Sequence, residues 1–83
     1  MKVMITIKFL GNLGEIVGKK ETHLQVDESV SEALKDICKG LNISPRDLSS
    51  CWLLINERQL VLCENTRLCH GDVLTFIPIV GSG

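Results

Sequence analysis

The sequence predicts an α+β domain in which a mixed sheet of about four to five strands carries one main helix on one face. Two segments near the start alternate apolar and polar residues, as half-buried strands do. Residues 29–41 carry one apolar stripe at helical spacing, and further apolar runs follow residue 50. One helix laid on one sheet is the economical packing for this order of elements.

The composition is that of a single folded domain. The chain has 83 residues, of which 45% are hydrophobic and 23% charged. Nine basic and ten acidic residues give a formal net charge of -1, which argues against nucleic acid as the main partner. The first apolar stretch contains Lys8 and lacks a signal-peptide pattern, and no apolar run is long enough to span a membrane. We therefore expect a cytoplasmic protein with no membrane partner.

The first strand is expected over residues 2–9. The residues on its apolar side are Val3, Ile5, Ile7 and Phe9. The glycine-rich segment 11–18 that follows is expected to be a connection with about one helical turn. From residue 21 to 26 the alternation resumes, with Leu24 and Val26 on the apolar side, so the two segments should form a hairpin.

The main helix is predicted to begin after Ser29 and to end near residue 40. Ser29 and Glu32 have the spacing of a capping box, in which each side chain satisfies a backbone N–H of the first turn. Gly40 and the later Pro45 should stop the helix. The stripe that should face the sheet consists of Val30, Ala33, Leu34, Ile37, Cys38 and Leu41.

The second half is expected to supply three strands after a polar loop around Pro45. Residues 51–56, CWLLIN, are apolar on both faces, which is typical of an inner strand or of one whose outer face meets a partner. NERQ should turn the chain into a strand over 60–63, and a Gly-Asp turn should precede a last strand over 73–77. Pro78 would end that strand. Two hairpin units joined by a crossover helix form the ubiquitin-like β-grasp.

Free-standing catalysis is not expected from this sequence. It contains no recognisable nucleophile triad, phosphate loop or paired carboxylates, and one helix on one sheet leaves little room for a catalytic cavity. Cys63, Cys69 and His70 lie close together, but their spacing matches no tetrahedral zinc pattern. We expect no metal and no bound cofactor, and free thiols that are buried or half-buried.

The C-terminal residues 79–83 are expected to form a flexible tail beyond a domain of residues 1–78. Five extended residues reach roughly 17 Å, at about 3.4 Å each, which is enough to enter another protein's active site. Glycines keep such a thread slim, and a carboxylate on Gly83 would be an unhindered acyl group once ATP had activated it. A frayed terminus is the simpler alternative.

The sequence resembles the small subunit of molybdopterin synthase and, more distantly, the thiamin-pathway sulfur carrier, both ubiquitin-like proteins. The similar stretches are MKVMITIKFLGNLGEIVGKKE, LLINERQ and LCHGDVLTFIPIVGSG. The resemblance implies a non-catalytic small subunit of a molybdopterin synthase-type sulfur transferase, acting in molybdenum or tungsten cofactor synthesis. An adenylating enzyme would use ATP to activate Gly83, which would become a thiocarboxylate. Val80, Gly81 and Ser82 would thread the channel of a large catalytic subunit.

Other interpretations stay open, because Ser82 stands where the family usually has glycine. The chain could instead be a sulfur carrier for thiamin or another pathway. It could also be a β-grasp protein-binding module, or a protein modifier without sulfur transfer.

The sheet face opposite the helix is the predicted docking surface. Neighbouring residues of a strand point to opposite faces, so when Leu53 and Phe76 pack under the helix, the residues beside them point outward. An exposed apolar patch on a small protein usually marks a partner site. The surface would consist of Trp52, Leu54, Val73, Ile77 and Ile79. For Trp52, a second small core under the loop 41–50 is the alternative.

Overall fold

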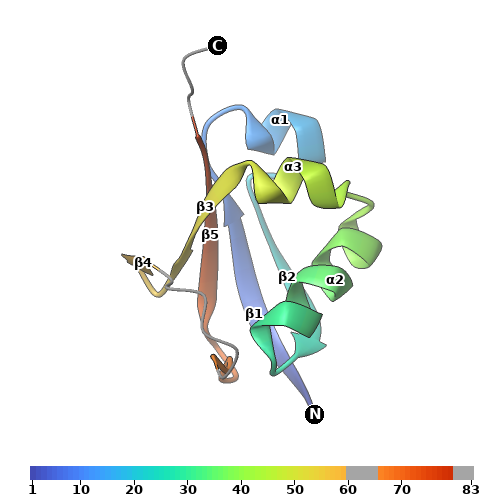
Figure 1. The fold of residues 1–83 in the computed structure, drawn as a ribbon, viewed down its shortest axis with the longest axis vertical. Helices are drawn as coiled ribbons and strands as arrows, with labels where there is room; N and C mark the ends of the chain where they lie inside the picture. The colour runs from blue at the N-terminus through green and yellow to red at the C-terminus, as the bar shows by residue number, and fades with distance from the viewer. Residues whose placement is uncertain (60–65, 80–83) are drawn as a thin grey trace.

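The structure is a computed structural model that describes residues 1–59 and 66–79, and its strands form one five-stranded sheet in the order β2-β1-β5-β3-β4. Its elements are β1 (Lys2–Phe9), α1 (Leu13–Val17), β2 (Glu21–Asp27), α2 (Val30–Leu41), α3 (Pro45–Ser49), β3 (Cys51–Ile55), β4 (Arg58–Gln59) and β5 (Val73–Pro78). The helices lie on one side of the sheet (Figure 1). The predicted α+β arrangement is therefore confirmed. No helix within the described ranges is long and apolar enough to cross a membrane.

The two central strands, β1 and β5, run parallel, and every other pairing is antiparallel. The register places Ile7 beside Leu74 and Phe9 beside Phe76. The rings of Phe9 and Phe76 stack with their centroids 5.7 Å apart. This parallel pair joins the N-terminal hairpin to the C-terminal strands, as the β-grasp requires.

The core lies between α2 and the sheet. The alternation of the first strand is confirmed, since Ile5, Ile7 and Phe9 are all buried beneath the helix side of the sheet. The buried apolar residues are Ile5, Ile7, Phe9, Leu13, Val26, Val30, Ala33, Ile37, Ile43, Leu48, Leu68, Leu74 and Phe76. Half of the predicted helix stripe is fully buried, whereas Leu34, Cys38 and Leu41 are partly buried at its margin.

The predicted capping box is wrong. Ser29 is the N-cap of α2, but its hydroxyl makes no capping hydrogen bond and lies 3.1 Å from the hydroxyl of Ser31. The backbone N–H of Ser29 donates instead to the Asp27 carboxylate at 2.9 Å. The Asp27 side chain thus accepts the Ser29 N–H, which is the role that the capping box predicted for Glu32.

The predicted end of α2 near residue 40 is confirmed, but Gly40 is not the residue that stops the helix. The helix runs through Gly40 to Leu41, and Asn42 in the left-handed conformation, with φ 56°, is its C-cap. Asparagine tolerates this conformation better than most residues. A Cβ atom at Gly40 would lie 3.2 Å from the Leu24 side chain, so the glycine allows α2 to approach β2 closely. Gly40 therefore serves the packing of α2 against β2, and it does not end the helix.

A short helix, α3, occupies the segment predicted to be a polar loop. Ser44 caps it by accepting a hydrogen bond from the N–H of Arg46 at 3.2 Å, and Pro45 stands at its first turn. Proline is favoured in the first turn because a backbone N–H there has no acceptor within the helix, so its absence removes no hydrogen bond. Leu48 anchors α3 in the core.

The turn predicted over NERQ is confirmed at Asn56 and Glu57, whereas Arg58 and Gln59 already form β4. Asn56 and Glu57 both have positive φ angles, of 50° and 69°, as a tight turn between antiparallel strands requires. The predicted strand over 60–63 lies outside the described residues.

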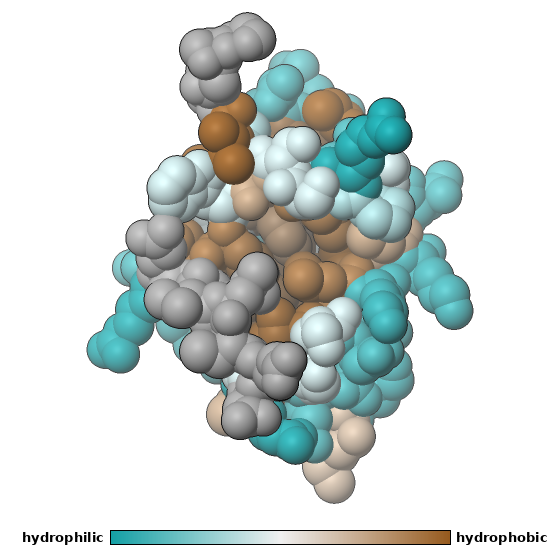
Figure 2. All heavy atoms as spheres, in the orientation of Figure 1, coloured by the Kyte–Doolittle hydropathy of each residue, from teal (hydrophilic) through white to brown (hydrophobic). Residues whose placement is uncertain are grey.

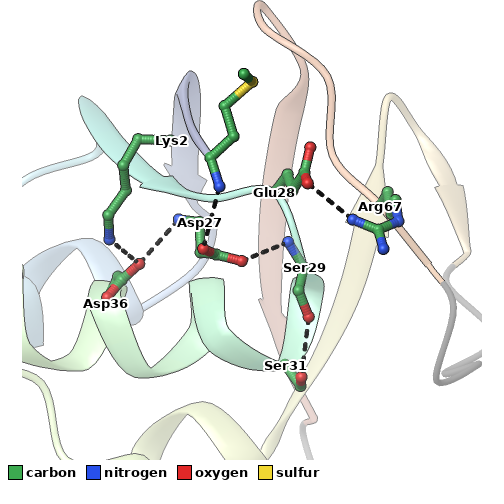
Figure 3. A network of polar contacts seen from close by, with 8 residues as sticks. Lys2, Asp27, Glu28, Ser29, Ser31, Asp36 and Arg67 are labelled. Atoms are coloured by element: carbon green, nitrogen blue, oxygen red, sulfur yellow. Dashed lines mark hydrogen bonds and ion pairs between the residues drawn. The ribbon is translucent and has the colours of Figure 1, made fainter.

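Polar contacts fasten α2 to the N-terminal hairpin (Figure 3). The Asp36 carboxylate accepts hydrogen bonds from the Lys2 ammonium at 2.9 Å and from the Asp27 N–H at 2.8 Å. The Lys2 side chain, followed by the Asp27 N–H, holds the pKa of Asp36 below its ordinary value. The Asp27 N–H lies at an edge strand, so this contact also occupies a donor that would otherwise face solvent.

A second contact fastens the segment before β5 to the start of α2. Arg67 pairs with Glu28 at 2.8 Å (Figure 3). The Leu68 N–H also donates to the Glu28 carbonyl, at 2.6 Å. Leu68 thereby enters the core beneath the first turn of α2. The polar contacts of Figure 3 therefore gather at the end of the sheet where β1 begins.

Ile37→Ala should destabilise the domain by about 2 to 5 kcal/mol, because Ile37 is fully buried and a cavity would remain. Leu34→Ala should cost less, since Leu34 is only partly buried at the margin of the core. Urea denaturation of both variants checks this order. Equal losses would mean that α2 is rotated from the position described.

Asp36→Asn should lower the melting temperature at neutral pH and lose this effect in acid. Because the folded-state pKa of Asp36 is depressed, its ionised form stabilises the fold above the unfolded value of about 4, and that stability disappears as the pH falls through the folded-state pKa. Melting curves of both proteins between pH 7 and pH 2 should therefore converge at the acidic end. A constant difference across this range would assign the effect of the variant to packing.

Candidate functional site

The sheet face away from α2 carries an apolar half on β3 and β5. Trp52 and Ile79 are the most exposed of the predicted docking residues, at 48% and 52%. Leu54, Val73 and Ile77 are half-buried beside them. The register sets Trp52 directly opposite Ile77, so these side chains form one patch. We call Trp52, Leu54, Val73, Ile77 and Ile79 the docking patch; strand alternation places the first four on the sheet face away from α2, and Ile79 follows directly after β5.

The other half of this face is mostly polar, with the exposed Met4 as an apolar exception. Thr75 is buried between Leu54 on β3 and Lys8 on β1, and marks the boundary between the two halves. Beyond it, β1 and β2 present Lys8 and Thr6 opposite Glu21 and His23. A partner that recognises the whole face would therefore contact an apolar half next to a polar half.

The root of the predicted tail is held from two sides. The Leu10 N–H donates to the Phe76 carbonyl at 3.0 Å, and the Ile79 N–H donates to the Ser50 carbonyl at 3.2 Å. Gly11, with φ +59°, faces Pro78 so closely that a Cβ atom would lie 2.9 Å from the proline ring. The chain is thus fixed up to Ile79. The predicted tail residues Val80, Gly81, Ser82 and Gly83 lie outside the described residues.

A hollow of about 870 Å³ opens on the helix side of the sheet, between α2, α3 and β3. Figure 2 shows apolar atoms gathered at the centre of this face. We call this hollow the helix groove. Its lining residues are Glu32, Leu34, Lys35, Asp36, Cys38, Lys39, Pro45, Leu48, Ser49, Cys51, Trp52, Leu53, Phe76 and Ile79.

The helix groove was not predicted from the sequence, because its upper wall is α3, where a loop was expected. Trp52 and Ile79 belong both to this groove and to the docking patch. The alternative prediction, a small core that covers Trp52, is wrong, because 48% of its surface is exposed even though α3 lies beside it. Apolar surface therefore continues from one face of the sheet to the other around the start of β3.

Two thiols line the helix groove. Cys38 and Cys51 are half-buried, and burial raises the pKa of both. The carboxylate of Asp47 raises the pKa of Cys51 further, and its thiol donates to the Asp47 carbonyl at 3.2 Å. Neither thiol has the lowered pKa of a reactive cysteine.

The predicted Cys63, Cys69 and His70 group is only partly described, because Cys63 lies outside the described residues. Cys69 is exposed rather than half-buried, and its N–H donates to the Asp72 carboxylate at 2.7 Å. His70 accepts a hydrogen bond at Nδ1 from the Met4 N–H at 3.2 Å. These contacts hold the turn before β5 against β1. In residues 1–59 and 66–79, no three histidine, cysteine or carboxylate side chains form a metal-binding group.

No protein-family model matches the sequence, and no curated protein resembles it closely enough in sequence to be matched. Solved structures do match. Small archaeal modifier protein 1 from Methanosarcina acetivorans has a TM-score of 0.81 at 18% identity, over 100% of this chain and 99% of that one. Urm1 from Sulfolobus solfataricus has a TM-score of 0.69 at 21% identity, over 89% and 99%.

A third match is to a complex of subunits 1 and 2 of the molybdopterin-converting factor from Helicobacter pylori. The TM-score is 0.69 at 21% identity, over 98% of this chain and 100% of that one. At such identities the likeness shows a shared fold. The predicted resemblance is thus confirmed at the level of architecture, and the chain has the ubiquitin-like β-grasp fold.

Proposed function

We propose that this protein is a sulfur carrier that serves molybdopterin synthesis as the small subunit of a molybdopterin synthase. The observation that carries the proposal is the continuity of β5, which contributes Val73 and Ile77 to the docking patch and leads directly through Ile79 to the tail. A partner that binds the patch therefore binds beside the point from which the tail starts. The full-length likeness to molybdopterin-converting factor structures supports this assignment.

The chemistry belongs to the Gly83 carboxylate. In the adenylating enzyme, a carboxylate oxygen attacks the α-phosphorus of ATP, pyrophosphate leaves, and an acyl-adenylate forms. A donor with sulfur at the oxidation level of sulfide then attacks the acyl carbon and displaces AMP, which leaves a thiocarboxylate. ATP is thus a substrate of the partner enzyme, and this chain itself holds no cofactor in the proposed reaction.

The reach of the tail fits delivery into another protein. From Ile79, the four residues Val80 to Gly83 extend at most about 14 Å, at about 3.4 Å per residue. The acyl group therefore reaches beyond the globule but stays near the docking patch. In this proposal, Val80, Gly81 and Ser82 pass through the channel of the large catalytic subunit, and both encounters take place in the cytoplasm.

A protein modifier is the second candidate function. It is favoured by the likeness to small archaeal modifier protein 1, which covers the whole chain. The same activated Gly83 would then react with a lysine amine and form an isopeptide bond. A sulfur carrier for another pathway, or a docking module without acyl chemistry, would use the same patch.

Intact-mass spectrometry tests the assignment. The full chain is incubated with ATP, a sulfide source and the adenylating enzyme of the same organism. We expect a mass increase that corresponds to exchange of one oxygen for one sulfur, with an AMP adduct when the sulfide is omitted. A modifier would instead appear as conjugates to other proteins. A chain that acquires neither adduct contradicts both acyl-transfer functions.

Removing Gly83 should abolish thiocarboxylate formation without unfolding the domain. Shortening by one residue withdraws the carboxylate by roughly 3.4 Å, and misplacement on the order of 1 Å in an active site can cost about a hundredfold in rate. The measurement is sulfur loading by mass, with the melting temperature as the control for folding.

Ser82→Gly is the matched variant for this deletion. If the hydroxymethyl group crowds the acyl centre, the variant should be adenylated faster than the parent. If the partner has adapted to serine, the rate should stay equal or fall. For the deletion itself, sulfur loading at the parental rate in the chain that lacks Gly83 would contradict the proposal that Gly83 carries the acyl group.

Ile77→Glu should abolish binding to the large catalytic subunit while the domain stays folded, because a carboxylate would be buried without a partner at the centre of the docking patch. Ile16→Glu is the control, since Ile16 is an exposed isoleucine on α1, outside the patch. Calorimetric titration of both variants checks the outcome. Undiminished binding by Ile77→Glu would remove this face from the interface.

A further inference from the structure

We propose that the large catalytic subunit also inserts an apolar segment into the helix groove, so that its interface extends around the start of β3 to the helix side of the sheet. This inference rests on the proposed function and names a second contact of the same partner. It is carried by three features: the position of the groove beside the tail, its continuity with the docking patch, and the chemistry of its walls.

The groove opens at the root of the tail. Ile79, the last described residue, is one of its walls and is fixed there by its hydrogen bond to Ser50. Because Gly83 lies at most about 14 Å from Ile79, the site that holds the acyl group lies within that distance of the groove mouth. The body of any protein that encloses this site is therefore adjacent to the groove.

The groove is also continuous with the docking patch. Trp52 is half exposed and lines the groove, while its register partner Ile77 lies at the centre of the patch. Trp52 and Ile79 belong to both surfaces, so the groove and the patch meet at these two side chains. A partner that covers Trp52 from the sheet face would leave an apolar edge in water unless it also covered the groove side.

The walls of the groove favour an apolar occupant. Leu48 and Phe76, both buried in the core, form part of its floor, with half-buried Leu34 and Leu53 beside them. Three of the four charged α2 residues that line the groove are paired within the chain, and the fourth, Lys39, makes no ion pair with another described residue. Lys35 pairs with Glu32 at 3.3 Å, and Asp36 pairs with Lys2 at 2.9 Å.

A charged segment would gain little from these pairs and would lose its hydration in the hollow. Aliphatic or aromatic side chains of the partner would instead remove apolar surface from water on both sides. The hollow, at about 870 Å³, has room for several such side chains.

The cysteines of the chain provide the test. Cys38 and Cys51 line the groove, whereas Cys69 is exposed on the turn before β5 and lies outside it. The full chain is alkylated with iodoacetamide, alone and in the complex with the large subunit of the same organism, and each cysteine is followed by peptide mass. An alkaline buffer is needed, because burial raises the pKa of Cys38 and Cys51.

We expect complex formation to slow the alkylation of Cys38 and Cys51 by about tenfold or more, as covering of a site should, while Cys69 reacts at the rate of the free chain. Unchanged rates at Cys38 and Cys51 in a complex that does form would overturn this inference and leave the proposed function standing. If no complex forms, the proposed function fails, and this inference fails with it.

A variant pair gives an independent measurement. Ser49→Arg places a long charged side chain at the groove rim, on the exposed end of α3, whereas Ser31→Arg places the same group on exposed α2 surface outside the groove. Ser49→Arg should weaken binding of the large subunit by about tenfold or more, and Ser31→Arg should not. Equal affinities of the two variants would contradict an occupied groove. Unchanged melting temperatures would show that both variants are folded.

Discussion

The parallel pairing of β1 with β5 is the contact on which the rest of the structure depends. It sets Phe9 against Phe76 and brings the C-terminal ends of both strands to the same end of the sheet. The loop after β1 therefore meets the end of β5, where Gly11 lies against Pro78 and Leu10 donates to the Phe76 carbonyl. Without this pairing, β5 would have no fixed end from which a tail could be directed. This long-range pairing of two strands thus determines the geometry of the candidate site.

Periodicity made much of this fold predictable, because it is a local property of the sequence. The alternation in residues 2–9 identified the buried face of β1, and the stripe in α2 identified the helix face that packs on the sheet. One error arose where a residue contacts a neighbour that is distant in the sequence. Gly40 lies inside α2, because it makes room for Leu24, and no sequence signal specifies that contact. The error at the N-cap of α2 is local instead: Asp27, two residues before Ser29, accepts the Ser29 N–H, and the spacing of Ser29 and Glu32 did not distinguish this contact from a capping box.

The candidate site was predictable to a similar extent and for the same reason. Strand alternation placed Trp52 and Ile77 on the outer face, and the structure sets them opposite each other. The helix groove is formed where α2, α3 and β3 pack together. The sequence pattern of a single segment does not predict how three separate segments pack. The signal for α3 was present, since Ser44 followed by Pro45 is typical of a helix start, but α3 is so short that a loop was equally consistent with the pattern.

The two ends of the sheet differ in how they are stabilised, and this difference suits the proposed docking of a partner at one of them. At the end where β1 begins, Asp36 and Glu28 hold the hairpin, α2 and the segment before β5 together through charged contacts. At the Pro78 end, among the described residues, backbone hydrogen bonds and apolar packing hold the root of the tail, and the side-chain hydrogen bonds nearby stay within α3 and the first residues after it. A partner can therefore cover the docking patch and the part of the helix groove beside Ile79 without breaking the Glu28 contacts, whereas Asp36 lines the groove and is the charged contact that such a partner would approach.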